Sequence, residues 1–178
     1  MRTLARTVIT ATSVGGITVL LLGAACQMAG ARINTSKSIP VGLYWTTRGP
    51  MDKGAYVLAC PPPSGVFNEA RERGYIGAGF CPGGYGYLMK QVAATARDTV
   101  TVTSEGIHVN GERWPQSMIH LADKAGRLLP RFQADGYVLG HEEVLLMSDG
   151  STTSFDGRYF GLVSRAQLQT AIKRIVTW

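Results

Sequence analysis

The first part of the chain contains a long stretch without any charged residue, from Thr7 to Ala31. At a rise of about 1.5 Å per residue this stretch makes about 37 Å of α-helix, more than the roughly 30 Å of a bilayer's hydrocarbon core. It predicts one transmembrane helix through residues 7–31, in contact with the lipid bilayer. Arg2 and Arg6 precede it and Arg32 follows it. By the positive-inside rule, we expect residues 1–32 to be a cytoplasmic N-terminus and anchor, and residues 33–178 to be an outer domain.

A cleavable signal peptide is the alternative to an anchor. The segment Ala29-Gly30-Ala31 has the spacing of small residues that is typical of a cleavage site. The uncharged stretch is longer than the roughly 7–15 apolar residues of such a signal, which favours an uncleaved anchor.

The outer part of the chain has the pattern of a mainly β, β-rich domain. The 178 residues leave room for one domain of ordinary size. Beyond Arg32, short apolar stretches alternate with Gly, Pro and Asn, which is typical of strands and turns. The clearest hairpin signal is formed by residues 99–103 and 107–109. The other elements that the pattern predicts are strands at 55–59, 87–93, 136–139 and 144–147, an irregular insertion at 64–86 and an amphipathic helix at 164–176.

The distribution of charge argues against nucleic acid as a partner. The chain carries 18 Lys and Arg against 12 Asp and Glu, a net charge of +6. Three of the arginines flank the membrane segment, so the remainder of the chain carries a net charge of only about +3. No cluster of Lys and Arg interleaved with aromatic residues occurs elsewhere, so we expect no nucleic-acid binding.

Two cysteines lie in the predicted outer domain. In an oxidising compartment, a disulfide between Cys60 and Cys81 closes a loop of about 20 residues. Two buried, unpaired thiols are the alternative, and the sequence leaves both open. The cysteines and histidines lack any recognised zinc-ligand spacing, so we expect no metal and no cofactor.

The segment just beyond Arg32 is polar and is broken by Gly and Pro; it reads Asn34-Thr35-Ser36-Lys37-Ser38-Ile39-Pro40-Val41-Gly42-Leu43-Tyr44. Ser38 stands only six positions after Arg32, near the predicted membrane surface. A serine hydroxyl becomes a nucleophile where a base and oxyanion donors converge, and the backbone N–H groups of a tight turn can be such donors. A juxtamembrane linker without chemistry is the alternative.

Lys90 lies in the predicted strand 87–93, and its position there indicates a role. Alternation of side chains places Lys90 on the same face as Leu88 and Val92. If that face is buried, loss of water disfavours the ammonium and lowers its pKa, as a general base requires. The alternative is a lysine whose amine extends into water at the end of the strand.

The third segment with possible chemistry is rich in hydroxyl groups. It reads Ser148-Asp149-Gly150-Ser151-Thr152-Thr153-Ser154-Phe155-Asp156-Gly157-Arg158-Tyr159-Phe160-Gly161. An acidic and a basic residue two positions apart, Asp156 and Arg158, are suited to bracing an active centre; a polar loop joined by local hydrogen bonds is the alternative. No Gly-x-Ser-x-Gly motif accompanies the histidines, which argues against a Ser/His/Asp triad.

These three segments, in this order behind one membrane span, resemble the signal peptidase I superfamily of Ser/Lys proteases, and more closely its TraF branch, the conjugative-transfer peptidases. The matching residues are 34–44, 87–92 followed by 98–100, and 154–161. General signal peptidases have Ser-Met-x-Pro, whereas here Pro40 follows Ser38 by only two residues. Ser148-Asp149-Gly150-Ser151 stands where general signal peptidases have Gly-Asp-Asn-Arg. Both departures favour the specialised branch.

The resemblance implies a signal-peptidase-like β-rich catalytic domain and a role for each matched residue. Ser38 is implied as the nucleophile, Lys90 as the general base and Asp156 as a catalytic residue of the third segment. Ser36 and the Ser38 backbone N–H are implied as an oxyanion hole. Ser154 and Arg158 are expected to support the site.

The implied function is that of a serine endopeptidase without a cofactor, anchored once in a bacterial inner membrane with its catalytic domain in the periplasm. Its expected partners are a propilin or related transfer-protein precursor and the conjugation machinery, with cyclisation of the pilin in some plasmid systems. The alternatives are a general signal peptidase I and a non-catalytic structural subunit of a conjugation apparatus.

Overall fold

The computed structural model describes the backbone of residues 2–178 and the side chains of residues 12–178. Residue 1 and the side chains of residues 2–11 lie outside this description. They include Arg2 and Arg6, which we expect in the cytoplasm, and positions 7–11 of the predicted span. The chain divides into two units between Arg32 and Ile33.

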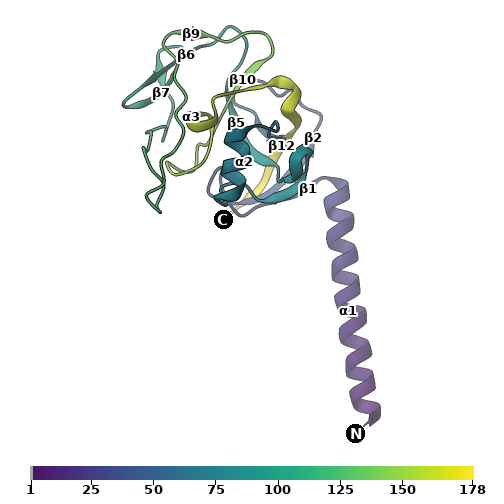
Figure 1. Cartoon of the computed structure of the whole chain (residues 1–178). Helices are drawn as coiled ribbons and strands as arrows, with labels where there is room; N and C mark the ends of the chain where they lie inside the picture. Colours follow the sequence, from purple (N-terminus) through teal and green to yellow (C-terminus); the bar gives the residue numbers. More distant parts are fainter. Residues whose placement is uncertain (1) are drawn as a thin grey trace. The chain divides into compact units, whose positions relative to one another are not determined.

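The N-terminal unit consists of the helix α1 (Arg2–Ala29), drawn in purple in Figure 1, and the first two residues of strand β1 (Ala31–Asn34). The window Thr12–Ala29 of α1 has a mean hydropathy of 1.5, and by length and composition the helix can cross a membrane. Within the part of the chain that the structure describes, it is the one helix with this property.

The second unit is built on two β-sheets, and β6, β7 and β9 lie together at one end of it (Figure 1). The larger sheet has seven strands, in the spatial order β1 (Ala31–Asn34), β2 (Gly42–Thr47), β12 (Leu168–Thr177), β3 (Tyr56–Ala59), β5 (Leu88–Ala94), β10 (Glu143–Met147) and β11 (Leu162–Ser164). The smaller sheet has four strands, in the order β8 (Glu112–Arg113), β7 (Gly106–Val109), β6 (Thr99–Thr103) and β9 (Tyr137–Val138). The prediction of a mainly β domain behind one N-terminal apolar helix is confirmed.

Several predicted strands are confirmed closely. The hairpin predicted at residues 99–109 is present, with Val100 opposite Val109 and Thr103 opposite Gly106. The strands predicted at 55–59, 87–93 and 144–147 correspond to β3, β5 and β10, which are neighbours in the larger sheet. The strand predicted at 136–139 is shorter, because β9 pairs with β6 through only two residues.

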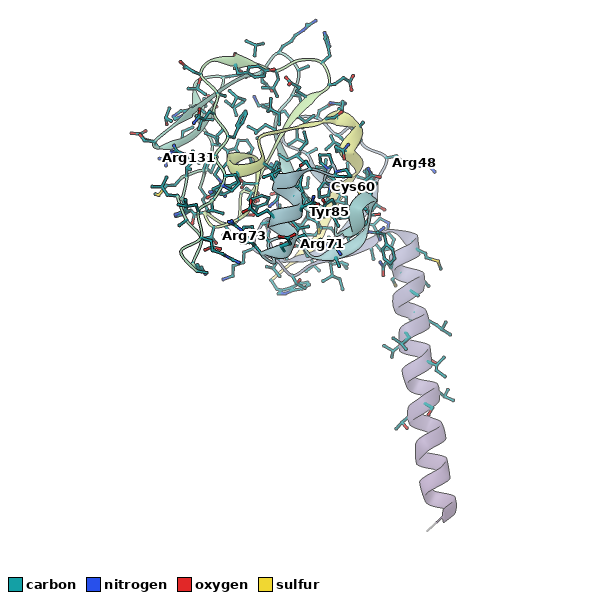
Figure 2. All side chains as sticks on the ribbon, viewed as in Figure 1. Arg48, Cys60, Arg71, Arg73, Tyr85 and Arg131 are labelled. Atoms are coloured by element: carbon teal, nitrogen blue, oxygen red, sulfur yellow. A yellow bond between two sulfur atoms is a disulfide. The ribbon has the colours of Figure 1, made fainter. Side chains whose placement is uncertain are left out.

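The prediction of an irregular insertion at residues 64–86 is wrong in part. The segment contains α2 (Gly65–Glu72), the short strand β4 (Ala78–Cys81) and a 3₁₀ turn, η1 (Pro82–Gly84). Phe67 and Ala70, three positions apart, lie on one face of α2 and are buried in the core. Tyr85 is labelled in Figure 2. Its ring packs against Phe67 of this helix. Burial of this face stabilises the helix. The sequence pattern does not predict it, because the Gly and Pro residues on either side are typical of irregular segments.

The amphipathic helix predicted at residues 164–176 is also wrong. The chain there forms a 3₁₀ turn, η2 (Arg165–Gln167), and then the long strand β12. β12 lies between β2 and β3 and forms antiparallel ladders with both. Its β-branched residues, such as Ile172 and Val176, favour a strand, and the two neighbouring strands satisfy its backbone groups. The helical spacing of Leu168, Ile172 and Ile175 is therefore incidental.

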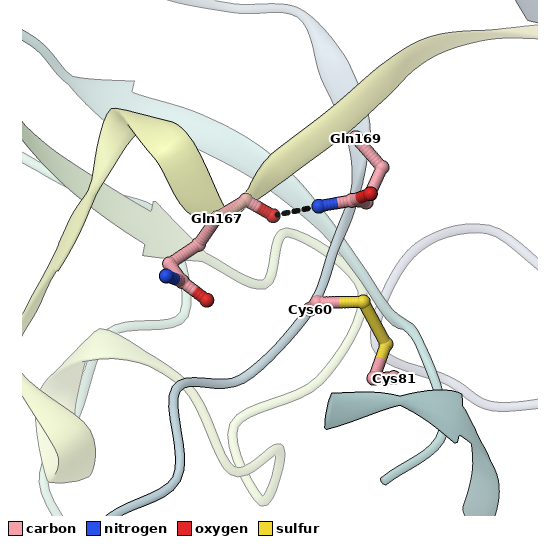
Figure 3. Close-up of a disulfide and its surroundings, with 4 residues drawn as sticks. All are labelled: Cys60, Cys81, Gln167 and Gln169. Carbon is pink, nitrogen blue, oxygen red and sulfur yellow. Dashed lines mark hydrogen bonds between the residues drawn. A yellow bond between two sulfur atoms is a disulfide. The ribbon is translucent and has the colours of Figure 1, made fainter. Parts of the chain in front are cut away.

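Cys60 and Cys81 are joined by a disulfide, which ties the end of β3 to the end of β4 (Figure 3). Their Cα atoms are 5.4 Å apart, and both residues are buried. The Cys60 backbone N–H donates to the carbonyl oxygen of Gln167 at 2.9 Å. The disulfide thus holds the segment that contains α2 against the larger sheet.

We predict that replacing both Cys60 and Cys81 with alanine lowers the free energy of unfolding by about 3 kcal/mol, because the unfolded chain regains the freedom of a 21-residue loop. Urea unfolding of the full chain in detergent measures this change. Cys26→Ala is the control, because Cys26 is a free cysteine in α1 and its loss opens no loop. A loss below about 1 kcal/mol for the double variant contradicts the prediction.

Candidate active site

The turn that carries Ser38 connects β1 to β2 and is held by the buried side chain of Asn34, which is 3% exposed. Asn34 Nδ2 donates to the carbonyl oxygens of Ser36 (2.8 Å), Ile39 (2.9 Å) and Pro40 (3.1 Å). Its Oδ1 accepts from the backbone N–H of Ser36. One amide group therefore binds the backbone on both sides of Ser38 and fixes the shape of the turn.

Gly150 allows the segment 148–161 to approach the same turn closely. Its backbone N–H donates to the Ser38 carbonyl oxygen at 3.4 Å. A Cβ atom at position 150 would lie 2.5 Å from the Lys37 carbonyl oxygen, a distance that real Cβ atoms do not reach. Glycine is thus required here by the close approach of two backbones.

Lys90 lies on β5, a central strand of the larger sheet, opposite Val57 of β3. The prediction that it shares a buried face with Leu88 and Val92 is confirmed, since Lys90 is only 2% exposed. This burial lowers the pKa of Lys90 to about 8; the negative charge of Asp156 opposes the shift and the positive charge of Arg158 adds to it. With this pKa about a tenth of the amine is neutral at pH 7, far more than for an ordinary lysine.

Three serine hydroxyls surround the amine of Lys90. Its Nζ lies 3.1 Å from Ser38 Oγ, 2.9 Å from Ser148 Oγ and 2.7 Å from Ser154 Oγ. Ser154 Oγ is also 2.9 Å from Ser38 Oγ. The structure thus brings together three residues that the sequence singled out, Ser38, Lys90 and Ser154, over more than 110 positions of the chain.

Asp156 and Arg158 form a buried ion pair behind this cluster, and both are fully buried. Arg158 Nε donates to Asp156 Oδ1 at 2.7 Å and its Nη2 donates to Oδ2 at 2.8 Å. Asp156 Oδ2 also accepts from the backbone N–H of Ser148 at 3.1 Å. The side chain of Asp156 is hydrogen-bonded to Ser148 and Arg158 and not to Ser38 or Lys90. Asp156 therefore fixes the positions of Ser148 and Arg158 and does not contact the nucleophile or the base.

Arg158 also binds the backbone of the surrounding loops. Its Nη1 donates to the carbonyl oxygens of Thr152 (2.6 Å) and Met118 (2.9 Å), and its Nη2 to that of Ser154 (2.9 Å). An arginine has enough donors for all these acceptors at once. The loop that carries Ser154 is therefore fixed through a buried guanidinium.

Ser36 is placed differently from the expectation of an oxyanion donor. Its Oγ donates to Asn34 Oδ1 at 2.9 Å. To stabilise an oxyanion, this hydroxyl must rotate away from Asn34.

Two residues of the site escaped the sequence analysis. Asn34 and Ser148 stand first in the serine segment and in the third segment, and neither position alone indicates a role in the site. Ser148 directly follows β10, where Met147 pairs with Gln91, so the register of the two strands places Ser148 beside Lys90; the sequence alone does not give this register.

Ser38 and Lys90 line a cavity of about 270 Å³. A neighbouring cavity of about 480 Å³ lies between the segment 120–129 and the third segment, and both cavities are lined by Tyr75 and Phe155. The rings of these two residues, with centroids 5.4 Å apart, form a wall common to both cavities.

Among residues 12–178, no three His, Cys, Asp or Glu side chains are grouped to hold a metal ion. The arrangement is suited to nucleophilic attack by Ser38 with Lys90 as the base.

We predict that Asn34→Ala lowers the free energy of unfolding by about 2 kcal/mol, because three carbonyl oxygens of the turn lose a buried donor. Urea unfolding of the full chain measures the loss. Gln169→Ala is the matched control, since its amide makes one exposed hydrogen bond to the Gln167 carbonyl oxygen (Figure 3) and its loss should change stability by under about 0.5 kcal/mol. Equal effects of the two variants would show that Asn34 does not hold the turn.

Comparison with known proteins gives a consistent result. The family model described as "Signal peptidase, peptidase S26" matches residues 1–178. The chain is 61% identical over 165 residues to the "Plasmid transfer protein TraF" of Escherichia coli, with 93% of each chain covered. It is 36% identical over 160 residues to the "Conjugal transfer protein TraF" of Agrobacterium tumefaciens (strain 15955), with 88% of each covered.

Among solved structures, a signal peptidase I from Enterococcus faecalis V583 aligns with a TM-score of 0.40 and 14% identity, covering 71% of this chain and all of that one. The resemblance to the signal peptidase I superfamily and its TraF branch is confirmed by the family model and by the relatives of high identity. The chain therefore belongs to the signal peptidase family, peptidase S26.

Proposed function

We propose that the chain is a serine endopeptidase in which Ser38 is the nucleophile and Lys90 the general base. The observation that carries this proposal is the 3.1 Å contact between Lys90 Nζ and Ser38 Oγ inside a buried site. A lysine can act as a base only if an appreciable fraction of its amine is neutral, and the burial of Lys90 supplies this condition.

The reaction is an acyl transfer in two stages. Neutral Lys90 takes the proton of Ser38 as Oγ attacks the scissile carbonyl, and the backbone N–H of Ser38 stabilises the oxyanion. The tetrahedral intermediate collapses, the C–N bond breaks, and the leaving amine takes the proton from Lys90. Water then attacks the ester with Lys90 again as the base, and Ser38 is regenerated. Ser36 joins the oxyanion hole if its hydroxyl turns from Asn34 toward the substrate.

The proposed substrate is a propilin or a related transfer-protein precursor. The support is that relatives which match 86–93% of this chain carry the names plasmid or conjugal transfer protein. If the amino group of the substrate's own N-terminus takes the place of water, the same acyl-enzyme yields a cyclic pilin. The other components of the conjugation machinery are the natural partners of such an enzyme.

The proposed location is a bacterial inner membrane, with α1 as a single span and the catalytic domain in the periplasm. The apolar window Thr12–Ala29 supports the span, and the basic residues Arg2 and Arg6 support a cytoplasmic N-terminus. The disulfide between Cys60 and Cys81 supports an oxidising compartment for the domain.

We predict that Ser38→Ala and Lys90→Met each reduce processing of a co-expressed candidate pilin precursor at least about 1,000-fold, because the nucleophile or its base is lost. Mass spectrometry of the pilin measures the product, and a mass one water below the trimmed linear chain indicates ring closure. Lys173→Ala, at an exposed position of β12, is the control that retains processing. Equal processing by the wild type and the Ser38 and Lys90 variants would exclude the peptidase and favour a structural subunit.

We predict that kcat/KM rises with pH and levels off above about pH 9, with an inflection near the Lys90 pKa of about 8. Below that pH the neutral fraction of the amine falls about tenfold per pH unit, and the rate falls with it. A pH–rate profile on a synthetic peptide that spans the mapped cleavage site measures the inflection. An inflection near the ordinary lysine value of 10.5 would contradict the role of burial.

A further inference from the structure

Ser148 is a fully buried serine whose every polar atom is fixed. Its backbone N–H donates to Asp156 Oδ2 at 3.1 Å, and its carbonyl oxygen accepts from Trp114 Nε1 at 3.3 Å. Its hydroxyl lies 2.9 Å from Lys90 Nζ and donates to Ser154 Oγ at 2.6 Å. The side chain thus stands in one orientation, directed at the amine.

The number of N–H donors on Lys90 indicates what the Ser148 hydroxyl does. A neutral amine has two N–H donors and one lone pair, whereas the ammonium has three donors and no lone pair. Lys90 Nζ has three hydroxyl neighbours at hydrogen-bond distance, Ser38, Ser148 and Ser154. When Ser148 and Ser154 each accept one N–H, the lone pair is left for the proton of Ser38.

Without Ser148, one N–H of the buried neutral amine has no acceptor. An unpaired buried donor costs about 1–3 kcal/mol, so the amine would turn and donate that N–H to Ser38 Oγ. In that orientation Lys90 cannot take the Ser38 proton. The hydroxyls of Ser148 and Ser154 also lie in a chain that ends at Ser38, since Ser154 Oγ is 2.9 Å from Ser38 Oγ.

We propose that Ser148 is a positioning residue that turns the lone pair of Lys90 toward Ser38. The proposal rests on the proposed Ser/Lys function and adds a third hydroxyl to its machinery. Ser148 acts through Lys90 and does not touch the substrate.

Loss of a hydroxyl that positions Lys90 also changes the titration of Lys90, which loss of a purely structural hydroxyl would not do. Ser148 Oγ accepts from Lys90 in both protonation states, and more strongly from the ammonium. The charged groups that act on Lys90 are Asp156, Asp149 and Arg158, and truncation of Ser148 changes none of them. Removing the hydroxyl therefore disfavours the ammonium, and the pKa of Lys90 falls.

The test compares Ser148→Ala with the wild type, and Ser148→Thr with Ser148→Val, a pair of equal shape that differs in the hydroxyl. The full chain is studied in detergent. Kinetics are measured on a synthetic peptide spanning the cleavage site mapped in the pilin precursor. The pKa of Lys90 is measured by NMR titration of ¹³C-labelled lysines, with its signal assigned through Lys90→Arg.

We expect Ser148→Ala to lower kcat about tenfold or more, with KM unchanged and the titration of Lys90 displaced to lower pH. Ser148→Thr should keep most of the activity that Ser148→Val loses, and this pair decides the matter if Ser148→Ala does not fold. Ser151→Ala is the control, because the Ser151 hydroxyl contacts Thr153 in the same loop and leaves Lys90 untouched.

An unchanged kcat and titration in Ser148→Ala, a titration displaced to higher pH, or equal activity of the Thr and Val variants would overturn the proposal. Failure of the proposed function has a different signature, because Ser38→Ala would then process the substrate as the wild type does. The NMR titration needs no substrate and tests the contact between Ser148 and Lys90 in either case.

Discussion

The burial of Lys90 places a destabilising group in the middle of the larger sheet. Lowering its pKa from 10.5 to about 8 corresponds to a free-energy cost on the order of 3 kcal/mol. The folded chain bears this cost in full below pH 8, and the cost disappears as the pH rises past 10.5. The stability that offsets it comes from elsewhere, including the core beneath the larger sheet and the disulfide between Cys60 and Cys81.

The arrangement of charge around Lys90 keeps its amine from becoming one half of an ion pair. Asp156 is buried nearby and by itself would hold Lys90 in the charged form. Arg158 binds both oxygens of that carboxylate, and its own positive charge acts on Lys90 in the opposite direction. The ion pair thus braces the loop through hydrogen bonds while it adds little net charge at the amine. Neutral hydroxyls are left as the direct neighbours of Nζ, as a general base requires.

Local patterns predicted the parts of this structure that local interactions determine. Alternation along residues 87–93 placed Lys90 on the buried face, and the turn after Thr103 predicted the hairpin. The apolar spacing of the C-terminal segment fits a helix and a strand equally well, and only its pairing with β2 and β3 favours the strand. The contacts of Ser148 and Asn34 depend on the register between distant strands and on the path of a turn. A single sequence contains neither piece of information.

On the proposed mechanism, the geometry also bears on the second half of the reaction. Once Ser38 carries the acyl group, its proton is gone, but Ser148 and Ser154 still hold Lys90 from the other side. The lone pair then faces whatever nucleophile approaches the ester, and it takes a proton from water or from an amine in the same way. The dyad itself does not select between a linear and a cyclic product. On this mechanism the choice depends on the residues that bring the nucleophile to the acyl-enzyme, and Tyr75 and Phe155 are candidates because they line the same cavity as Ser38.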